Sequence, residues 1–355
     1  MKCVGWLAVF VTVAGLGCQS STMTAAKLYI KQGQPQEAKK QLALVLQTEP
    51  ENYEAHLLMG KLLGEEGRYG EMAEHLALAE RNPKFQSEVE QTRRQFWIRE
   101  YNAGIGYAQG EAPNYVMARH SFHNATIIDE SALDAWRGLA HVYYQIDSTD
   151  AAIATYQKIA LADPEDERIF SNLGVLYSER GDLDAAIRAF SQMVKINPEN
   201  LTGLTSLADA QAQAEDYEGS EANYRKVIEL NPGDFRLHFN LGNLYWQQEK
   251  YTAAKRAYEQ AVELIKEDYE DALTATQDAA QVTKLKEQYE DALYNLAMSH
   301  LATEDMDGAL PLLEQLAKQT PDNALVWHHL GTVYAHKDLV EESEAAFARA
   351  AELEE

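Results

Sequence analysis

Three pairs of an aspartate or asparagine followed by proline recur at a fixed interval through the middle of the chain. The pairs are Asp163-Pro164, Asn197-Pro198 and Asn231-Pro232, so that successive prolines are 34 residues apart. A fixed period of this length is typical of helical repeat proteins, in which one repeat cannot bury its apolar face alone and stacks on its neighbours. The period therefore predicts an array of stacked units and not a single globular core.

Small and large side chains follow the same period. Repeats aligned on it begin near residues 19, 53, 99, 133, 167, 201, 235, 290 and 324. The eighth position is always alanine or glycine: Ala26, Gly60, Gly106, Ala140, Gly174, Ala208, Gly242, Ala297 and Gly331. The twentieth position is small in every repeat but the second: Ala38, Met72, Ala118, Ala152, Ala186, Ser220, Ala254, Ala309 and Ser343. The twenty-fourth position is large and apolar: Leu42, Leu76, Phe122, Tyr156, Phe190, Tyr224, Tyr258, Leu313 and Phe347. We interpret each repeat as two helices, A and B, that cross at the small residues and enclose the large one.

The period and the three aligned positions resemble the tetratricopeptide repeat family, over residues 19–355 apart from two insertions. The resemblance implies an all-α fold, a right-handed α-solenoid of about nine helical hairpins. It also implies that each Asx-Pro pair closes helix B and caps the next helix A, with proline at the first helical position. The expected organisation is a signal peptide of lipoprotein type at 1–17, repeats 1 and 2 at 18–86, a helical insertion at 87–98, repeats 3 to 7 at 99–268, a helical insertion at 269–289, and repeats 8 and 9 at 290–355.

The period breaks at two places. Twelve extra residues, 87–98, precede the third repeat, and 21 extra residues, 269–289, follow the seventh. We expect the first insertion to lengthen helix A of repeat 3. The second contains neither glycine nor proline, so we expect it to extend two neighbouring helices into a protruding hairpin. Insertions in repeat arrays often lie on a binding face, and a tolerated surface excursion explains them equally well.

The first 18 residues resemble an export signal. An uncharged apolar run extends from Cys3 to Gly17, and it is shorter than the roughly 20 residues of a membrane-spanning helix. The run ends at Gly17-Cys18 and is followed by the polar residue Gln19, which resembles a bacterial lipobox. The resemblance implies lipidation of Cys18 and, from Gln19, sorting to the outer membrane. An ordinary secretory signal with an incidental cysteine is the alternative, and it would give a freely secreted periplasmic protein.

Charge and cysteine content narrow the possible partners. The chain carries 31 lysine and arginine residues against 56 aspartate and glutamate residues, a formal net charge of −25. Nucleic-acid binding depends on basic side chains that neutralise phosphates, so this balance argues against it. The acidic surface is explained either by solubility or by a basic partner. Both cysteines, Cys3 and Cys18, precede the repeats, which therefore contain no disulfide and no cysteine metal site.

No group of residues in the repeats indicates catalysis. His120 and His123 lie one helical turn apart and His328 and His329 are adjacent, but a zinc site needs three or four converging ligands. The repeats contain no nucleotide-binding loop and no Ser/His/Asp signature. We therefore predict a protein that is not an enzyme and has no metal, no cofactor and no small-molecule substrate.

In the resembled family, partner peptides lie in a groove lined by helix A positions 2, 5, 9, 12 and 13. Carried over residue by residue, this implies a protein-binding groove lined by Arg137, His141, Tyr144, Arg236, Phe239, Asn243, Trp246, Tyr294 and Met298. Repeats 5 and 6 contribute Arg168, Ser171, Val175, Thr205 and Asp209 at the same positions. The Lys and Asn residues of the family's carboxylate clamp are absent. Four of the residues form an apolar patch, which we interpret either as an interface hot spot or as packing against the second insertion: Phe239, Trp246, Tyr294 and Met298.

The leading hypothesis is a lipid-anchored scaffold in the bacterial cell envelope. It resembles outer-membrane tetratricopeptide lipoproteins that act as pilotins for pilus secretins or as adaptors for cell-wall enzymes. We expect protein partners that are basic or carry apolar anchor residues, and contact with the membrane through the lipid anchor only. The alternatives are a freely secreted periplasmic repeat protein and a regulatory, non-catalytic subunit of an enzyme complex.

Overall fold

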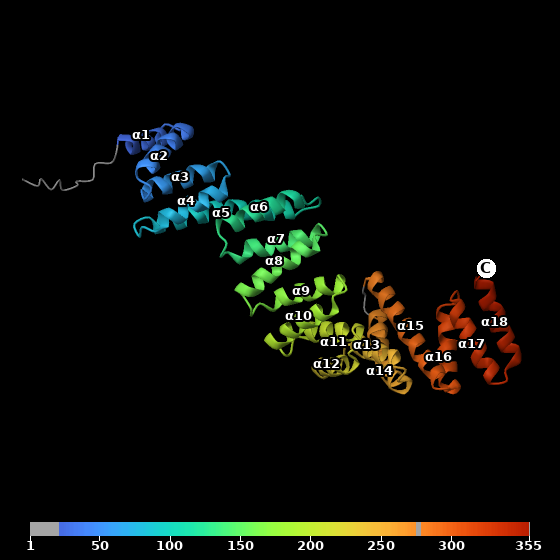
Figure 1. Cartoon of the computed structure of the whole chain (residues 1–355). Helices are drawn as coiled ribbons and strands as arrows, with labels where there is room; N and C mark the ends of the chain where they lie inside the picture. Colours follow the sequence, from blue (N-terminus) through green and yellow to red (C-terminus); the bar gives the residue numbers. More distant parts are fainter. Residues whose placement is uncertain (1–20, 275–277, 355) are drawn as a thin grey trace, which may run out of the picture. The chain divides into compact units, whose positions relative to one another are not determined.

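The computed structural model describes residues 21–274 and 278–354, and every regular element within them is an α-helix. The chain divides into two compact units, residues 1–161 and 162–355, and each is described by itself. The first unit contains α1 (Ser21–Lys31), α2 (Pro35–Thr48), α3 (Tyr53–Glu65), α4 (Tyr69–Glu80), α5 (Gln86–Ala108), α6 (Tyr115–Ile128), α7 (Leu133–Gln145) and α8 (Thr149–Ala162), whose last residue lies past the boundary (Figure 1). The second contains α9 (Glu167–Glu179), α10 (Leu183–Ile196), α11 (Leu201–Gln213), α12 (Tyr217–Leu230), α13 (Phe235–Gln247), α14 (Tyr251–Thr274), α15 (Ala279–Ala302), α16 (Met306–Gln319), α17 (Ala324–His336) and α18 (Val340–Glu354). These eighteen described helices correspond to nine A–B pairs, and the predicted all-α fold class is confirmed.

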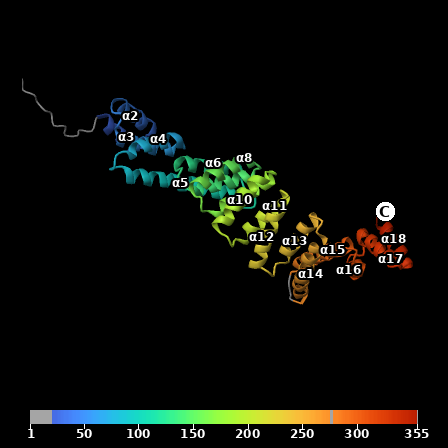
Figure 2. The same ribbon diagram turned by 60° about the horizontal axis from the view of Figure 1, so that its bottom comes forward.

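The packing follows the order of the repeats within each unit. In the first unit α1 packs on α2, α3 on α4 and α5 on α6. In the second, each odd-numbered helix from α9 to α17 packs on its even-numbered successor, as Figure 2 shows for α13 and α14. Apolar side chains from successive pairs join into local clusters, such as the one that contains Ile265, Leu293 and Val326. The core is therefore built by stacking, as the repeat pattern predicts.

Side-chain caps start most of the A helices, although not α5 or α7, and the Asx-Pro pairs do not supply them. Oδ1 of Asn200 accepts a hydrogen bond from the Gly203 N–H at 2.8 Å, and Asp234 likewise caps α13. Asn197 instead ends α10, and Pro198 lies in the turn before α11. The prediction that proline occupies the first helical position is therefore wrong. Proline shapes the turn, and the Asx residue two positions later begins the helix because its side chain satisfies an otherwise unpaired N–H group.

In eight of the nine repeats, the turn from helix A to helix B has a left-handed backbone at the fifteenth position. Glycine holds this conformation at Gly33, Gly67 and Gly181, where φ is 66°, 74° and 77°. Other residues hold it with φ between 55° and 61°: Asp147, Glu215, Glu249, Glu304 and Asp338. The conformation closes the helix end, since the N–H of Lys250 then donates to the Tyr245 carbonyl at 2.9 Å.

The small residue at position 8 leaves room for the large residue at position 24. A Cβ atom added at Gly242 would lie 2.6 Å from the Tyr258 ring. Repeat 3 differs, because nothing lies within 4 Å of a Cβ at Gly106, whereas one at Gly104 would lie 2.8 Å from Phe122. The register predicted through Gly106 is therefore wrong by two residues. The physical reason is a longer turn between α5 and α6, residues 109–114, compared with residues 66–68 between α3 and α4.

Both insertions lie in long helices. The 23-residue α5 contains residues 87–98, and the buried side chains Val89 and Phe96 join this segment to the core of the preceding repeats. The helices α14 and α15 have 24 residues each and contain the described part of 269–289. The rings of Tyr269 and Tyr289 lie 5.9 Å apart, so the two helices stay packed along this extension. Residues 275–277 of the insertion lie outside the described residues.

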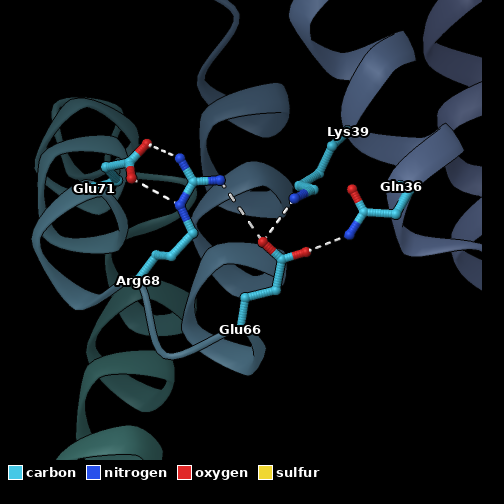
Figure 3. A network of polar contacts seen from close by, with 5 residues as sticks. All are labelled: Gln36, Lys39, Glu66, Arg68 and Glu71. Carbon is cyan, nitrogen blue, oxygen red and sulfur yellow. Dashed lines mark hydrogen bonds and ion pairs between the residues drawn. The ribbon is translucent and has the colours of Figure 1, made fainter.

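A polar network connects the first two repeats (Figure 3). Glu66, in the α3–α4 turn, accepts hydrogen bonds from Lys39 at 2.6 Å and from Gln36 at 2.8 Å, both on α2. Arg68 lies 3.7 Å from the same carboxylate and donates to Glu71 at 2.6 and 2.7 Å. The hydrogen bond from Lys39 holds the pKa of Glu66 below its usual value. Since these side chains remain partly in water, the network orients the turn more than it stabilises the pair.

Candidate functional site

The nine residues predicted to line a groove are divided between the two units. Arg137, His141 and Tyr144 lie on α7 of the first unit, and the other six lie on α13 and α15 of the second. Arg137 forms an ion pair with Asp134 at 3.1 Å, His141 is exposed, and Tyr144 is 40% exposed. Each group is therefore considered within its own unit.

Arg236 has a local structural role. Its guanidinium donates two hydrogen bonds to Asp234, at 2.8 and 2.7 Å, and the Asp234 carboxylate also caps α13. This pairing holds the pKa of Asp234 below its usual value. The arrangement fixes the start of the helix that carries the rest of the site.

Two rings of the predicted aromatic patch pack against helix B of the same repeat. Phe239 is half-buried, with its ring 5.6 Å from that of Tyr258 in an edge-to-face arrangement. Trp246 is also half-buried, with its ring 4.9 Å from that of Tyr251 at the start of α14. Both residues pack against the hydrophobic cluster of α13 and α14, and Phe239 also packs against the cluster that contains Tyr289. Helix B of the same repeat therefore covers part of these two rings, and their contact with a partner stays a prediction.

Asn243, in contrast, lines a cavity of about 250 Å³ between α11 and α13, here called the α11–α13 pocket. Its walls are formed by Asp209, Ala212 and Gln213 of α11, Tyr224 of α12, and Asn240, Asn243, Leu244 and Gln247 of α13. Asp209 is the sole acidic residue among these walls, and none of them is basic. The pocket combines amide groups, one carboxylate and two apolar contacts, which is the composition of a site for a polar group on a short apolar stem.

The same hydrogen bond is made twice at this pocket. The Tyr258 hydroxyl donates to Oδ1 of Asn243 at 2.6 Å, and the Tyr224 hydroxyl donates to Oδ1 of Asp209. Each tyrosine occupies position 24 of its repeat, and each acceptor occupies position 9, fifteen residues earlier. The large residue of the helical crossing therefore also fixes the orientation of a polar side chain on helix A.

Asp209 lacks a neutralising partner among the described residues. Burial raises the pKa of its carboxyl group, and no cation acts on it to lower the pKa again. Burial and the Asp209 charge raise the pKa of Tyr224 so far that its hydroxyl stays protonated, and the nearby Asn240 opposes this shift only in part. The hydroxyl therefore remains a donor to Oδ1, and Oδ2 of Asp209 receives no hydrogen bond from the described residues.

The sequence pattern assigned Asn243 and Asp209 to the binding face but missed part of the site. Asn240 lies at position 6, which the family pattern did not include, and Tyr224 was interpreted as packing alone. A signal for Tyr224 exists in the sequence. A tyrosine in place of phenylalanine at position 24 brings a hydroxyl that needs a partner when buried, and a polar residue stands fifteen positions earlier.

Tyr294 lines a second cavity, of about 340 Å³, where α15 meets the start of α17. Glu287, Glu290 and Asp291 share its wall, and burial together with the Glu287 charge raises the pKa of Asp291. Lys286 lies 3.4 Å from Glu290 and offsets part of this charge. Met298 is half-buried on α15 and lines neither of the two cavities.

Other predictions concern the membrane and metals. Cys18 lies outside the described residues. Within residues 21–274 and 278–354, no helix is both long enough and apolar enough to cross a bilayer. In the same ranges, no three His, Cys, Asp or Glu side chains are placed to hold a metal ion.

Successive pairs of helices that cross at the same repeat positions define a helical-repeat protein. Comparison with known families identifies which kind of repeat it is. A model described as tetratricopeptide repeat matches residues 23–85, 137–201, 265–324 and 294–354, more than half of the chain. A second model of the same description matches residues 235–268, and a TPR repeat model matches residues 208–249. The chain belongs to the tetratricopeptide repeat family. Its repeats support the role of a scaffold for protein–protein interaction.

Several solved structures resemble parts of this chain. A crystal structure of MamA protein is 22% identical with a TM-score of 0.45, and covers 54% of this chain and 93% of MamA. YrrB, titled a TPR protein with an unusual peptide-binding site, is 18% identical with a TM-score of 0.44, covering 56% of this chain and 91% of YrrB. PilF of Pseudomonas aeruginosa is 19% identical with a TM-score of 0.44, covering 65% of this chain and 95% of PilF. Likeness at this level carries no information about partners. No curated protein matches the chain.

Proposed function

We propose that this chain is a scaffold that holds a partner protein at the α11–α13 pocket of its second unit. The observation that carries the proposal is the pocket itself, a cavity of about 250 Å³ with polar groups already held in place. Tyr224 and Tyr258 fix Asp209 and Asn243 through hydrogen bonds, so their side chains need no ordering when a partner binds. Such preorganisation reduces the conformational entropy lost on association. We assign the chain no catalytic role.

Site-specific photocrosslinking in cells tests this binding face. A photoreactive amino acid at Gln247, which is exposed at the pocket, should give a discrete adduct with a partner protein. The same amino acid at Glu259, exposed on α14 and not part of the pocket, is the matched control. An adduct from Gln247 alone supports the proposal. Equal adducts from both positions, or an adduct from Glu259 only, would place the partner elsewhere.

We also propose that the scaffold is anchored through a lipid on Cys18 and faces the periplasm from the outer membrane. The apolar run that ends at Gly17-Cys18 supports this, together with the absence of cysteine from the remaining 337 residues of the sequence. More than one acyl chain on the cysteine is needed for stable anchoring, since each buried CH₂ contributes only about 0.8 kcal/mol.

Mass spectrometry of the mature N-terminus tests the anchor. We expect an N-terminal Cys18 that carries diacylglyceryl and acyl groups, and we expect Cys18→Ala to move the protein from the membrane fraction to the soluble one. An unmodified mature N-terminus would contradict the anchor and favour the freely secreted form. The system that the scaffold serves, such as a pilus, secretion or cell-wall complex, would follow from the crosslinked partner.

A further inference from the structure

The α11–α13 pocket contains an internal comparison that indicates what it binds. Asp209 and Asn243 occupy equivalent positions in repeats 6 and 7, and each accepts a hydrogen bond from the tyrosine of its own repeat. The two side chains have the same shape, and they differ in charge. The hydrogen bond to tyrosine therefore does not require a carboxylate, and the charge of Asp209 is not explained by the fold.

The surroundings of Asp209 differ from those of two other aspartates in the second unit, Asp234 and Asp305. Asp234 is paired with Arg236 at 2.7 Å, and Asp305 lies 3.2 Å from Lys255 and 2.8 Å from His300. Asp209 is partly buried as they are, but it has no basic side chain within ion-pair distance in the described part of the chain. A half-buried carboxylate without a cation is costly, because it has lost water without gaining a countercharge.

We propose that the α11–α13 pocket receives a cationic side chain, arginine or lysine, from a linear segment of the partner protein. This inference rests on the proposed function and specifies its chemistry. Oδ2 of Asp209 is the acceptor for the charged group. The amide oxygen of Asn240, which lines the same pocket, is a second acceptor. Ala212 and Leu244 provide apolar contacts for the aliphatic stem of the guest.

Charge complementarity selects this occupant over others. The walls present a carboxylate and amide oxygens with no basic group, so a phosphate or carboxylate guest would meet repulsion without a compensating cation. An apolar side chain would leave Asp209 buried and unpaired, which costs more than it gains. A cationic side chain instead donates hydrogen bonds to Oδ2 of Asp209, which otherwise receives none from the described residues.

A double-mutant cycle with defined peptides tests the inference. Twelve-residue peptides selected from a random library against the full chain should share a basic residue at one position. Replacing an arginine there by citrulline, its neutral isostere, should weaken binding to the native chain roughly tenfold or more, as expected for a hydrogen bond between charged groups. The same replacement should change binding to Asp209→Asn by much less. Native-like folding of Asp209→Asn is expected, since Asn243 shows that asparagine fits this geometry.

A gain-of-function variant strengthens the test. Asn243→Asp places a second carboxylate on the same tyrosine-supported position and should raise the affinity for the basic peptides. Equal loss from citrulline in the native chain and in Asp209→Asn would overturn the inference. Gln247→Trp, which narrows the exposed side of the pocket, separates the two proposals. If this variant blocks binding of peptides that show no preference for a basic residue, the pocket is still the binding face but the proposal of a cationic guest is wrong. If the selected peptides still bind to this variant, the pocket is not the binding face.

Discussion

At the scale of single residues, the space beside a glycine decides whether it can be replaced. Gly242 lies under the Tyr258 ring at the crossing of α13 and α14, whereas Gly106 has open space around its missing side chain. Both are helical glycines at position 8 of the sequence alignment, so the sequence pattern treats them as equivalent. Their substitution to alanine should therefore separate packing from helix propensity.

We predict that Gly242→Ala destabilises the protein by about 1–3 kcal/mol, because the new methyl group would lie 2.6 Å from the Tyr258 ring. Gly106→Ala should instead stabilise it by about 0.5–1 kcal/mol, since alanine loses less backbone entropy in a helix than glycine does. Urea denaturation of the two variants beside the native chain measures both changes. Equal effects of the same sign would show that the crossing does not constrain position 8.

A pair of histidines in the second repeat gives a prediction about pH. Nε2 of the buried His56 lies 3.0 Å from the Pro50 carbonyl and must be the donor, so Nδ1 of His56 accepts from Nδ1 of His75 at 2.8 Å. A proton added at Nδ1 of His56 would place two N–H groups against each other, whereas one added at Nε2 of His75 would put a charge on a partly buried ring. Burial and His56 lower the pKa of His75, while Glu71 and Glu74 on α4 oppose this shift.

Because its pKa is lower in the folded chain, His75 binds protons more readily after unfolding. Stability should therefore fall as the pH drops below about 6.5, the usual pKa of histidine. Thermal unfolding of the native chain and of His75→Gln, measured on either side of that pH, checks this. The variant should lose part of the pH dependence, whereas His120→Gln, on an exposed residue, should retain it. An unchanged profile for His75→Gln would contradict the assignment.

At the scale of helices and turns, the repeat pattern predicted the helical pairs well and their boundaries less well. Positions 8, 20 and 24 identified all nine hairpins, because the crossing of two helices restricts side-chain size at these points. Turn length is not restricted in the same way, and the longer turn between α5 and α6 moved the crossing glycine from Gly106 to Gly104. Pattern alone could not distinguish the two glycines.

The binding face was predictable only in part. Position 9 led to Asp209 and Asn243, since helix A positions recur with the repeat. The burial of Phe239 and Trp246 could not be read from the same pattern, because it depends on rings from the following helix, Tyr258 and Tyr251. The donor to Asp209 comes from helix B, so it too required the three-dimensional arrangement.

The turns between helices A and B supply the next prediction. Glu249 adopts φ of 57°, a conformation that costs a residue with a side chain about 1–2 kcal/mol and costs glycine little. Glu249→Gly should therefore stabilise the protein by about 0.5–1 kcal/mol after allowing for the greater unfolded-state entropy of glycine. Glu259→Gly, in the exposed interior of α14, should destabilise it by about 1 kcal/mol and serves as the control. Destabilisation by both would show that the side chain of Glu249 outweighs the backbone strain.

At the scale of the whole molecule, the net charge of −25 and the cation-accepting pocket act in the same direction. The acidic surface attracts a basic segment over distances of roughly a Debye length, about 10 Å at 0.1 M salt, and the pocket then fixes one of its side chains. The proposed lipid on Cys18 would confine this encounter to a membrane surface. The same charge argues against a nucleic-acid partner.

The charge gives a prediction of its own. Association with a basic peptide should slow and weaken several-fold as salt rises from about 50 to 500 mM, because screening removes the long-range attraction. Stopped-flow measurement of the association rate would show it. The peptide's citrulline variant should respond less, since it carries less charge. A rate independent of salt would mean that the acidic surface serves solubility alone.

The affinity of the crosslinked partner for three forms of the full chain tests the central claim most directly. The native chain, Gln247→Trp at the α11–α13 pocket and Glu259→Trp on the exposed face of α14 differ by one tryptophan at matched, solvent-exposed positions. We predict that Gln247→Trp weakens binding roughly tenfold or more, as expected for loss of a central contact, and that Glu259→Trp leaves it unchanged. Equal affinities for all three forms would contradict the assignment of the pocket as the binding face.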